Sequence, residues 1–242
     1  MKLPTHKKRA FRRSGFTLVE QLVVITIIVS LAAIIINVTY RLRARAESVN
    51  AFNHIRQSGM ILLGNAQENN SRLELFAGGA TGGFEIRAYN IVRANLGFDF
   101  TRWNNQQVNR ANIMHWNPKK VKPTNFHWNC FAVNFTDMPD FGVRWRVDNG
   151  RPDGSNVRML AIPTVDRPSA FPLLMDSSAA DGSEIFRIGI AQTELPALRN
   201  AGKCHAFFLD GSARQLDKVG LKTAGFRTAY DTSKSPPKLT NL

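Results

Sequence analysis

One unbroken apolar run near the start dominates the hydrophobic pattern of this chain. It covers residues 16–40. The run predicts a single helix of about 25 residues, which at 1.5 Å per residue is long enough to cross a bilayer core of roughly 30 Å. Glu20 lies inside the run, where a carboxylate costs about 2.5–3.5 kcal/mol at the bilayer centre and less near the interface. A charge in such a place needs a partner or a function.

The helical period continues beyond the apolar run. Apolar residues recur there at steps of mostly three and four, with polar residues between them: Leu42, Ala46, Val49, Phe52, Ile55, Met60, Leu63 and Ala66. This stripe predicts that the helix extends to about Ala66 and packs by one face onto a globular head. Gly59 and Gly64 weaken its last turns, and Asn-Asn-Ser at 69–71 marks its end. Because the apolar first half has no obvious partner within one chain, we expect it to drive polymerisation.

The remaining residues predict a head built mainly of strands. A Gly-rich segment at 77–83 favours a loop, although it lacks the Lys and Ser/Thr of a phosphate-binding loop. We expect a short helix around 88–96 and a long polar and aromatic loop over 99–125. Six β-rich segments, separated by Gly, Pro, Asp and Asn, are 127–135, 141–147, 157–162, 171–175, 184–190 and 205–209.

These elements together predict an α+β fold, in which a long N-terminal helix packs on a C-terminal antiparallel β-sheet head. The expected organisation has four parts. They are a basic leader at 1–15, a membrane-spanning half of the helix at 16–40, an amphipathic half at 41–70 and the head at 71–242.

The junction between the leader and the apolar run carries a specific motif, Gly15-Phe16-Thr17-Leu18-Val19-Glu20. A secretory signal has a shorter apolar region followed by a small-residue cleavage site, whereas here the small residue precedes a long run. A plain membrane anchor explains the hydrophobicity but not a Glu four residues beyond a Gly-Phe junction. The combination closely resembles the type III signal of type IV pilins and type II secretion pseudopilins.

The resemblance implies how the chain matures and assembles. Prepilin peptidase would cut after Gly15, and the new N-terminal amine of Phe16 would be methylated. Glu20 would neutralise the Phe16 amine of a neighbouring subunit, because a matched pair removes most of the penalty of either charge between apolar helices. A pair within one chain is the alternative, since the two residues are one helical turn apart. The expected partners are homologous subunits, the inner membrane, and the secretion or pilus assembly machinery.

Charge indicates the orientation. Six Lys or Arg residues precede the apolar run, whereas only Arg41, Arg43 and Arg45 follow it closely. This asymmetry favours a leader in the cytoplasm and a head in the periplasm, later in a periplasmic or surface filament. The formal net charge of +14 falls to +8 once the six leader cations are removed. The net charge of the mature chain is therefore weaker evidence for nucleic-acid binding than the net charge of the whole chain suggests.

A second resemblance lies near the C-terminus, in residues 165–169, 171–177 and 200–212. These segments are similar to the tail of large pilin-like proteins of planctomycetes and verrucomicrobia, which carry a His, nine residues and then Asp-Gly. Asp210 and Gly211 match the Asp-Gly, but Asn200 stands at the His position. Asp-Gly after an apolar run also suits a tight hairpin, because both central residues of a type I′ turn need a positive φ.

The sequence lacks the motifs of common enzymes. It contains no His-Glu-x-x-His, Gly-x-Ser-x-Gly, Walker-type Gly-x-x-x-x-Gly-Lys-Ser/Thr or Cys-x-x-Cys. We therefore expect no catalytic residues. Two cysteines, Cys130 and Cys204, lie in the part expected to be exported, where they could form a disulfide. Two buried thiols acting as small hydrophobes are the alternative.

We expect no cofactor. A calcium ion is the one possibility that the sequence leaves open. Some major pseudopilins hold a calcium ion in the head, and Asp137 with Asp140, or Asp176 with Asp181, could supply oxygen ligands. The Asp-x-Asp-x-Asp-Gly pattern is absent, and solvated loop carboxylates are the alternative.

The favoured function is a structural subunit, a pilin or pseudopilin. The alternative is a minor or tip subunit that binds DNA or a secreted substrate through its basic head. Cations alternate with aromatics at 102–103, 115–122 and 144–146, a combination that can contact phosphates and stack on bases. An ordinary solvated basic surface explains the same residues, so nucleic acid is not an expected partner. Both resemblances and the apolar helix favour the filament subunit.

Overall fold

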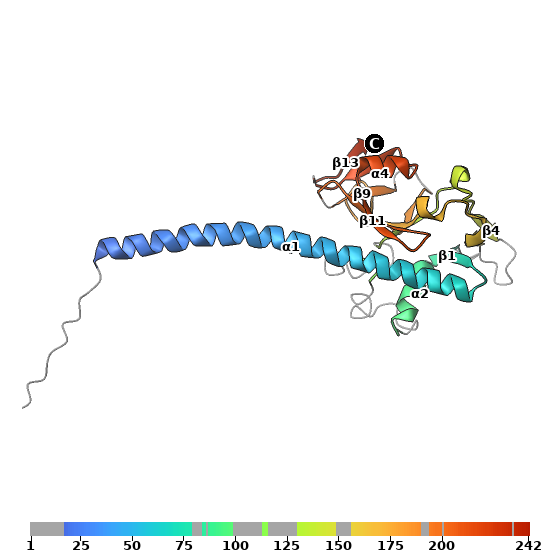
Figure 1. Cartoon of the computed structure of the whole chain (residues 1–242), viewed down its shortest axis with the longest axis horizontal. Helices are drawn as coiled ribbons and strands as arrows, with labels where there is room; N and C mark the ends of the chain where they lie inside the picture. Colours follow the sequence, from blue (N-terminus) through green and yellow to red (C-terminus); the bar gives the residue numbers. More distant parts are fainter. Residues whose placement is uncertain are drawn as a thin grey trace, which may run out of the picture. The chain divides into compact units, whose positions relative to one another are not determined.

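The computed structural model describes residues 17–78, 84–85, 87–98, 113–115, 130–148, 156–189, 194–199, 201–233 and 235–242. The chain divides into two compact units, residues 1–45 and residues 46–242. The α-helices within these described ranges are α1 (Leu18–Glu68), α2 (Arg87–Asn95) and α4 (Lys218–Thr223), and Figure 1 shows α1 as one continuous helix. Short 3-10 helices occupy Pro139–Phe141, Ile162–Thr164 and Pro168–Ala170.

The fold is α+β, as the sequence predicts: a long N-terminal helix is followed by sheets. The helix α1 has 51 residues and ends within two residues of the predicted end. Asn70 and Ser71 stop it with φ angles of 55° and 57°, in the left-handed region that does not continue a helix. The helix predicted around 88–96 is also confirmed, as α2.

In the second unit, α1 buries a stripe of small and aliphatic residues. The fully buried positions are Ala51, Ile55, Ser58, Gly59, Leu62 and Ala66. The predicted stripe was partly wrong, because Val49 and Met60 are exposed. Ser58 and Gly59 are buried in their place. A Cβ on Gly59 would lie 2.2 Å from the ring of Phe207, so the missing side chain lets the helix approach the sheet.

The first sheet has the order β2-β1-β5-β4, and all its pairs are antiparallel. Its strands are β1 (Arg72–Gly78), β2 (Phe84–Glu85), β4 (Arg146–Asp148) and β5 (Asn156–Ala161). The strand β1 was missed by the sequence analysis, and its last two residues lie in the segment predicted as a Gly-rich loop. The rest of that loop, and most of the loop predicted over 99–125, lie outside the described residues.

The second sheet is the centre of the head and has the order β11-β10-β6-β3-β8. Its strands are β3 (Ala132–Asn134), β6 (Pro172–Met175), β8 (Arg187–Ile188), β10 (Cys204–Phe208) and β11 (Ala213–Leu216). Every residue of β3, β6 and β10 is buried, which explains their almost continuous apolar sequences.

The third sheet has the order β13-β12-β9-β7. Its strands are β7 (Ser177–Ser178), β9 (Leu195–Leu198), β12 (Thr228–Asp231) and β13 (Lys238–Asn241). The head was predicted to be antiparallel throughout, and this is wrong for two pairs: β3 with β8, and β9 with β12, are parallel. Parallel partners need long crossovers, which local sequence patterns do not show.

Candidate functional site

The N-terminus of α1 is held by a capping box built from Thr17 and Glu20. The backbone N–H of Thr17 donates to Glu20 Oε2 at 2.8 Å, and the backbone N–H of Glu20 donates to Thr17 Oγ1 at 3.3 Å. The Thr17 hydroxyl also donates to Oε2, at 2.9 Å. Two backbone donors that the helix leaves free are satisfied in this reciprocal way. Glu20 therefore has a structural role within its own chain, which the sequence analysis did not foresee.

The predicted partners of Glu20 in processing, Gly15 and Phe16, lie outside the described residues. The pairing of Glu20 with the Phe16 amine stays a prediction. The two capping-box hydrogen bonds that the Glu20 carboxylate accepts both go to one oxygen, Oε2. The other oxygen, Oε1, is left to accept a further donor.

Polar residues inside the apolar half of α1 satisfy their own hydrogen bonds. Thr26, Ser30, Asn37 and Thr39 each donate to the carbonyl four residues before, at 2.7–3.1 Å. Such bonds hide a hydroxyl or amide from its surroundings, which suits a helix in an apolar environment. By length and composition, α1 is the one helix among the described residues that could cross a membrane.

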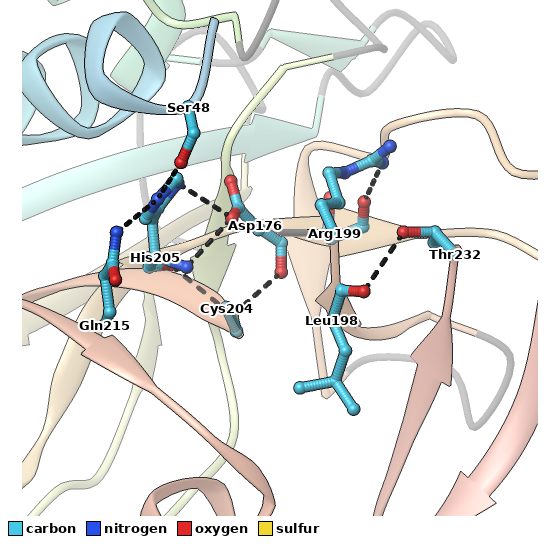
Figure 2. A network of polar contacts seen from close by, with 9 residues as sticks. Ser48, Asp176, Leu198, Arg199, Cys204, His205, Gln215 and Thr232 are labelled. Carbon is cyan, nitrogen blue, oxygen red and sulfur yellow. Dashed lines mark hydrogen bonds and ion pairs between the residues drawn. The ribbon is translucent and has the colours of Figure 1, made fainter. Parts of the chain in front are cut away.

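A second polar cluster lies in the head, where α1 packs on the central sheet (Figure 2). Its centre is His205 on β10, which is fully buried. Its Nδ1 lies 3.1 Å from Oδ2 of Asp176, which directly follows β6 and is also buried. The same carboxylate oxygen accepts the backbone N–H of His205 at 2.8 Å. On the other side of the ring, Nε2 lies 3.2 Å from Gln215 Nε2 and 3.4 Å from Ser48 Oγ on α1.

These contacts set the chemistry of the ring. Because the Gln215 amide nitrogen donates to Nε2, the imidazole accepts there and donates from Nδ1–H to Asp176. Ser48, His205 and Asp176 are the residue types of a serine-hydrolase triad. Here, however, the acceptor nitrogen is shared with an amide that is closer than the hydroxyl. The Phe52 ring also covers the imidazole, with centroids 5.5 Å apart. The arrangement is better suited to holding α1 on β10 than to activating Ser48.

The sequence analysis missed this cluster as a site, although both central residues lie in segments that carry the C-terminal resemblance. Asp176 lies within the segment 171–177, and His205 lies within 200–212. Their separation of 29 residues gives no local spacing signal. Only the antiparallel pairing of β6 with β10 brings them together.

The Asp-Gly motif forms the hairpin between β10 and β11, as predicted, but the turn type differs. The amide of Gly211 donates to Phe208 O at 3.0 Å, and the amide of Phe208 donates to Ser212 O at 2.8 Å. Gly211 has a φ of 86°, and Asp210 is not among the residues with a positive φ. This is a three-residue loop with a glycine bulge rather than a type I′ turn. Asn200, at the family's His position, lies outside the described residues.

Asp210 closes this hairpin from one side. Its Oδ1 accepts the backbone N–H and the hydroxyl of Ser212, at 2.9 and 2.6 Å, and its Oδ2 lies 3.2 Å from Arg214. Partial burial raises the pKa of Asp210, but the hydrogen bonds from Ser212 and the charge of Arg214 outweigh it and lower the pKa below its usual value. The carboxylate thus stabilises the turn in its ionised form.

Cys130 and Cys204 are two separate buried thiols in this structure. Of the two possibilities left open by the sequence, a disulfide or two small buried hydrophobes, the structure has the second. Burial is the main cause that raises the pKa of both thiols well above the usual value, and a nearby acid adds to it: Glu184 for Cys130 and Asp176 for Cys204. Cys204 Sγ also lies 3.5 Å from the carbonyl of Asp176.

We expect both cysteines to be unreactive in the folded chain. The thiolate is the reactive form, and burial with a raised pKa removes it at neutral pH. An aromatic disulfide reagent, added without reductant, should label neither cysteine in native protein and both in denaturant. Labelling of neither cysteine in denaturant would show that a disulfide links them.

Three of the four aspartates considered for calcium accept hydrogen bonds from the chain itself. Asp137 Oδ1 accepts the backbone N–H of Trp145 at 2.8 Å, and Asp181 Oδ1 accepts the backbone N–H and hydroxyl of Ser183. Asp176 is committed to His205. In the part of the chain that the structure describes, no group of three or more His, Cys, Asp and Glu residues could hold a metal ion.

The base-stacking surface considered for nucleic acid is only partly described. Trp145 is 7% exposed and packs edge-on against Phe135, with ring centroids 4.9 Å apart. A side chain so placed belongs to the core and offers no face to a base. Residues 102–103 lie outside the described ranges.

Comparisons of the chain with protein-family models, with curated proteins and with solved structures found no match.

Proposed function

We propose that the protein is a structural subunit of a filament, a pilin or pseudopilin of a type IV pilus-like or type II secretion system. It is inserted in the inner membrane with the leader in the cytoplasm, cut after Gly15 by prepilin peptidase, and assembled by packing of the apolar halves of α1. The head then lies in the periplasm or on the filament surface.

The observation that carries this proposal is the exposed apolar surface of α1 between Leu18 and Leu42. Its large aliphatic residues are about half or more exposed, Leu18 and Val29 at 83% and 67% for example. Soluble monomers rarely expose apolar patches larger than a few hundred Å². Lipid before assembly, and other copies of the helix afterwards, would cover this surface.

Glu20 fits the proposal because only one of its two carboxylate oxygens, Oε2, accepts the hydrogen bonds of the capping box. With Oε2 bound by Thr17, Oε1 can accept the ammonium group of an adjacent subunit without breaking the capping box. The charge would then select the neighbour whose N-terminus has been freed by cleavage. A leader that remained attached would leave no amine to pair.

Two substitutions at Glu20 separate its roles as a cap and as a charge. Glu20→Gln keeps an acceptor at the capping-box position but removes the charge, whereas Glu20→Ala removes both. We expect both variants to insert normally and to assemble on the order of a hundredfold less, because an unpaired buried charge costs about 3–5 kcal/mol. The yield of sheared filaments, normalised to membrane-inserted subunit, measures this effect.

The same preparations report on processing, since mass spectrometry of wild-type filaments should show an N-terminus at Phe16 carrying a methyl group. Assembly of Glu20→Gln at the wild-type level would mean that Glu20 acts only as a helix cap. It would contradict the pairing of Glu20 with the Phe16 amine of a neighbouring subunit. Residues 1–15 retained in assembled filaments would contradict the processing.

A further inference from the structure

The head contains a cavity of about 780 Å³ that no site described above uses. It lies among the last turns of α1, the start of β1 and α2, and Figure 1 shows β1 and α2 beside the C-terminal end of α1. Its volume falls within the range of about 300–1,000 Å³ that is usual for small-molecule sites. All its lining residues belong to the second unit.

Small residues on the two helices keep this cavity open. No atom lies within 4 Å of the place a Cβ on Gly64 would take, so the wall of α1 is recessed there. Ala94 on α2 is also exposed. Ile61 and Ile91, both half-buried, give the cavity an apolar part.

The charged residues of the lining cancel one another. Glu74 and Arg87 form an ion pair of 2.8 Å, and Glu68 and Arg72 are exposed. With two acids and two bases around one volume, neither an anion nor a cation gains a net Coulomb attraction. The lining therefore does not favour phosphate or a metal ion.

Four carboxamides complete the lining: Asn65, Asn69, Asn90 and Asn95. Asn90 is buried, Asn65 is half-buried, and Asn69 Nδ2 already donates to the backbone carbonyl of Asn65 at 2.7 Å. An amide offers two donors and an acceptor within one plane, and a Glu beside an Arg offers the same combination. A sugar hydroxyl also donates and accepts, so adjacent hydroxyls match such planar groups in pairs. The apolar faces of sugar rings would meet the two isoleucines.

We propose that this cavity binds a short neutral oligosaccharide. The side chains of Asn65 and Asn95 supply hydrogen-bond groups for its hydroxyls, and the space left by Gly64 takes part of a ring. The inference is independent of filament assembly, because it uses only residues of the second unit and none of the apolar half of α1.

Binding can be tested with the full-length chain in a detergent that has no sugar headgroup. Maltotriose, cellotriose and triacetylchitotriose serve as probes in titration calorimetry, and a blocked trialanine peptide serves as the competing class. We expect millimolar or tighter binding of at least one sugar and none of the peptide. Gly64→Phe, which fills the open space without touching the core, should abolish that binding.

Two further variants make the result specific to the cavity. Gly64→Ala is the matched control, because one methyl group fills far less of that space than the Phe side chain and should weaken binding much less. Asn95→Ala, on the exposed side of α2, should weaken binding by roughly threefold to tenfold, the value of about one hydrogen bond. Circular dichroism should show the same fold in all three variants. Binding of no sugar, binding unchanged in Gly64→Phe, or binding of the peptide alone would each overturn the proposal.

Discussion

Alanine at Gly59 will destabilise the head, whereas alanine at Gly64 on the same helix will stabilise it. A Cβ at Gly59 would lie 2.2–2.4 Å from three ring atoms of Phe207, which is fully buried and has little room to move. Such overpacking costs about 1–3 kcal/mol. At Gly64 the new methyl group meets nothing within 4 Å, so the helix gains about 0.5–1 kcal/mol from the reduced flexibility of the unfolded chain.

Thermal unfolding of the two variants, followed by circular dichroism, measures the difference directly. For a head of this size, each kcal/mol shifts Tm by about 2–4 °C. The shifts should be opposite in sign, which excludes a general effect of helix propensity because both changes are Gly→Ala. A Gly59→Ala protein as stable as wild type would mean that α1 does not approach β10 as described.

Removing the carboxylate of Asp176 should have a larger effect, a loss of about 3–5 kcal/mol, on the order of breaking a buried pair. Asp176 accepts both the backbone N–H and the ring nitrogen of His205, and both donors would remain buried without an acceptor. Asp176→Ala should therefore lower Tm by roughly ten degrees or leave the head unfolded.

Two comparisons make this result interpretable. Asp140→Ala changes the same residue type at an exposed position and should stay within about 0.5 kcal/mol of wild type. Ser48→Ala removes only the longer contact of 3.4 Å and should cost less than about 1 kcal/mol. A larger loss in Ser48→Ala than in Asp176→Ala would contradict the assigned order of strength within the cluster.

The features predicted well from sequence are those whose signal is local and repeated. The helix α1 was predicted to within two residues at either end, because an apolar run followed by a three-and-four periodicity persists along its whole length. Six strand segments each contain an observed strand or part of one, since β-rich stretches were bounded by turn residues.

The features predicted poorly depend on contacts between distant residues or on the absence of a side chain. The buried stripe of α1 was misplaced because Ser58 and Gly59 count as breaks in a hydrophobic pattern, whereas here both are buried and Gly59 lies against Phe207 of β10. The parallel pairing of β3 with β8 joins strands over 50 residues apart, beyond the reach of any local pattern. Strand β1 was lost because its end merges with the Gly-rich segment.

The candidate sites also divide into those with a local sequence signal and those formed by contacts between distant residues. Thr17 and Glu20 are three residues apart, so their capping box is a local signal that the sequence carries openly. His205 and Asp176 become a cluster only when two strands pair. The Asp-Gly hairpin was found by its motif, but its turn type was missed, because the loop uses Leu209 as well and needs a positive φ only at Gly211.

The back-bonded side chains of α1 have a consequence for how easily this helix can change its surroundings. Thr26, Ser30, Asn37 and Thr39 carry their hydrogen-bond partners with them on the preceding turn. Moving the segment from one apolar medium to another, whether acyl chains or the flank of another helix, neither makes nor breaks any of these four bonds. The transfer is nearly neutral in hydrogen-bond enthalpy for these groups. Its direction is then decided by van der Waals packing and by the one ionised side chain, Glu20.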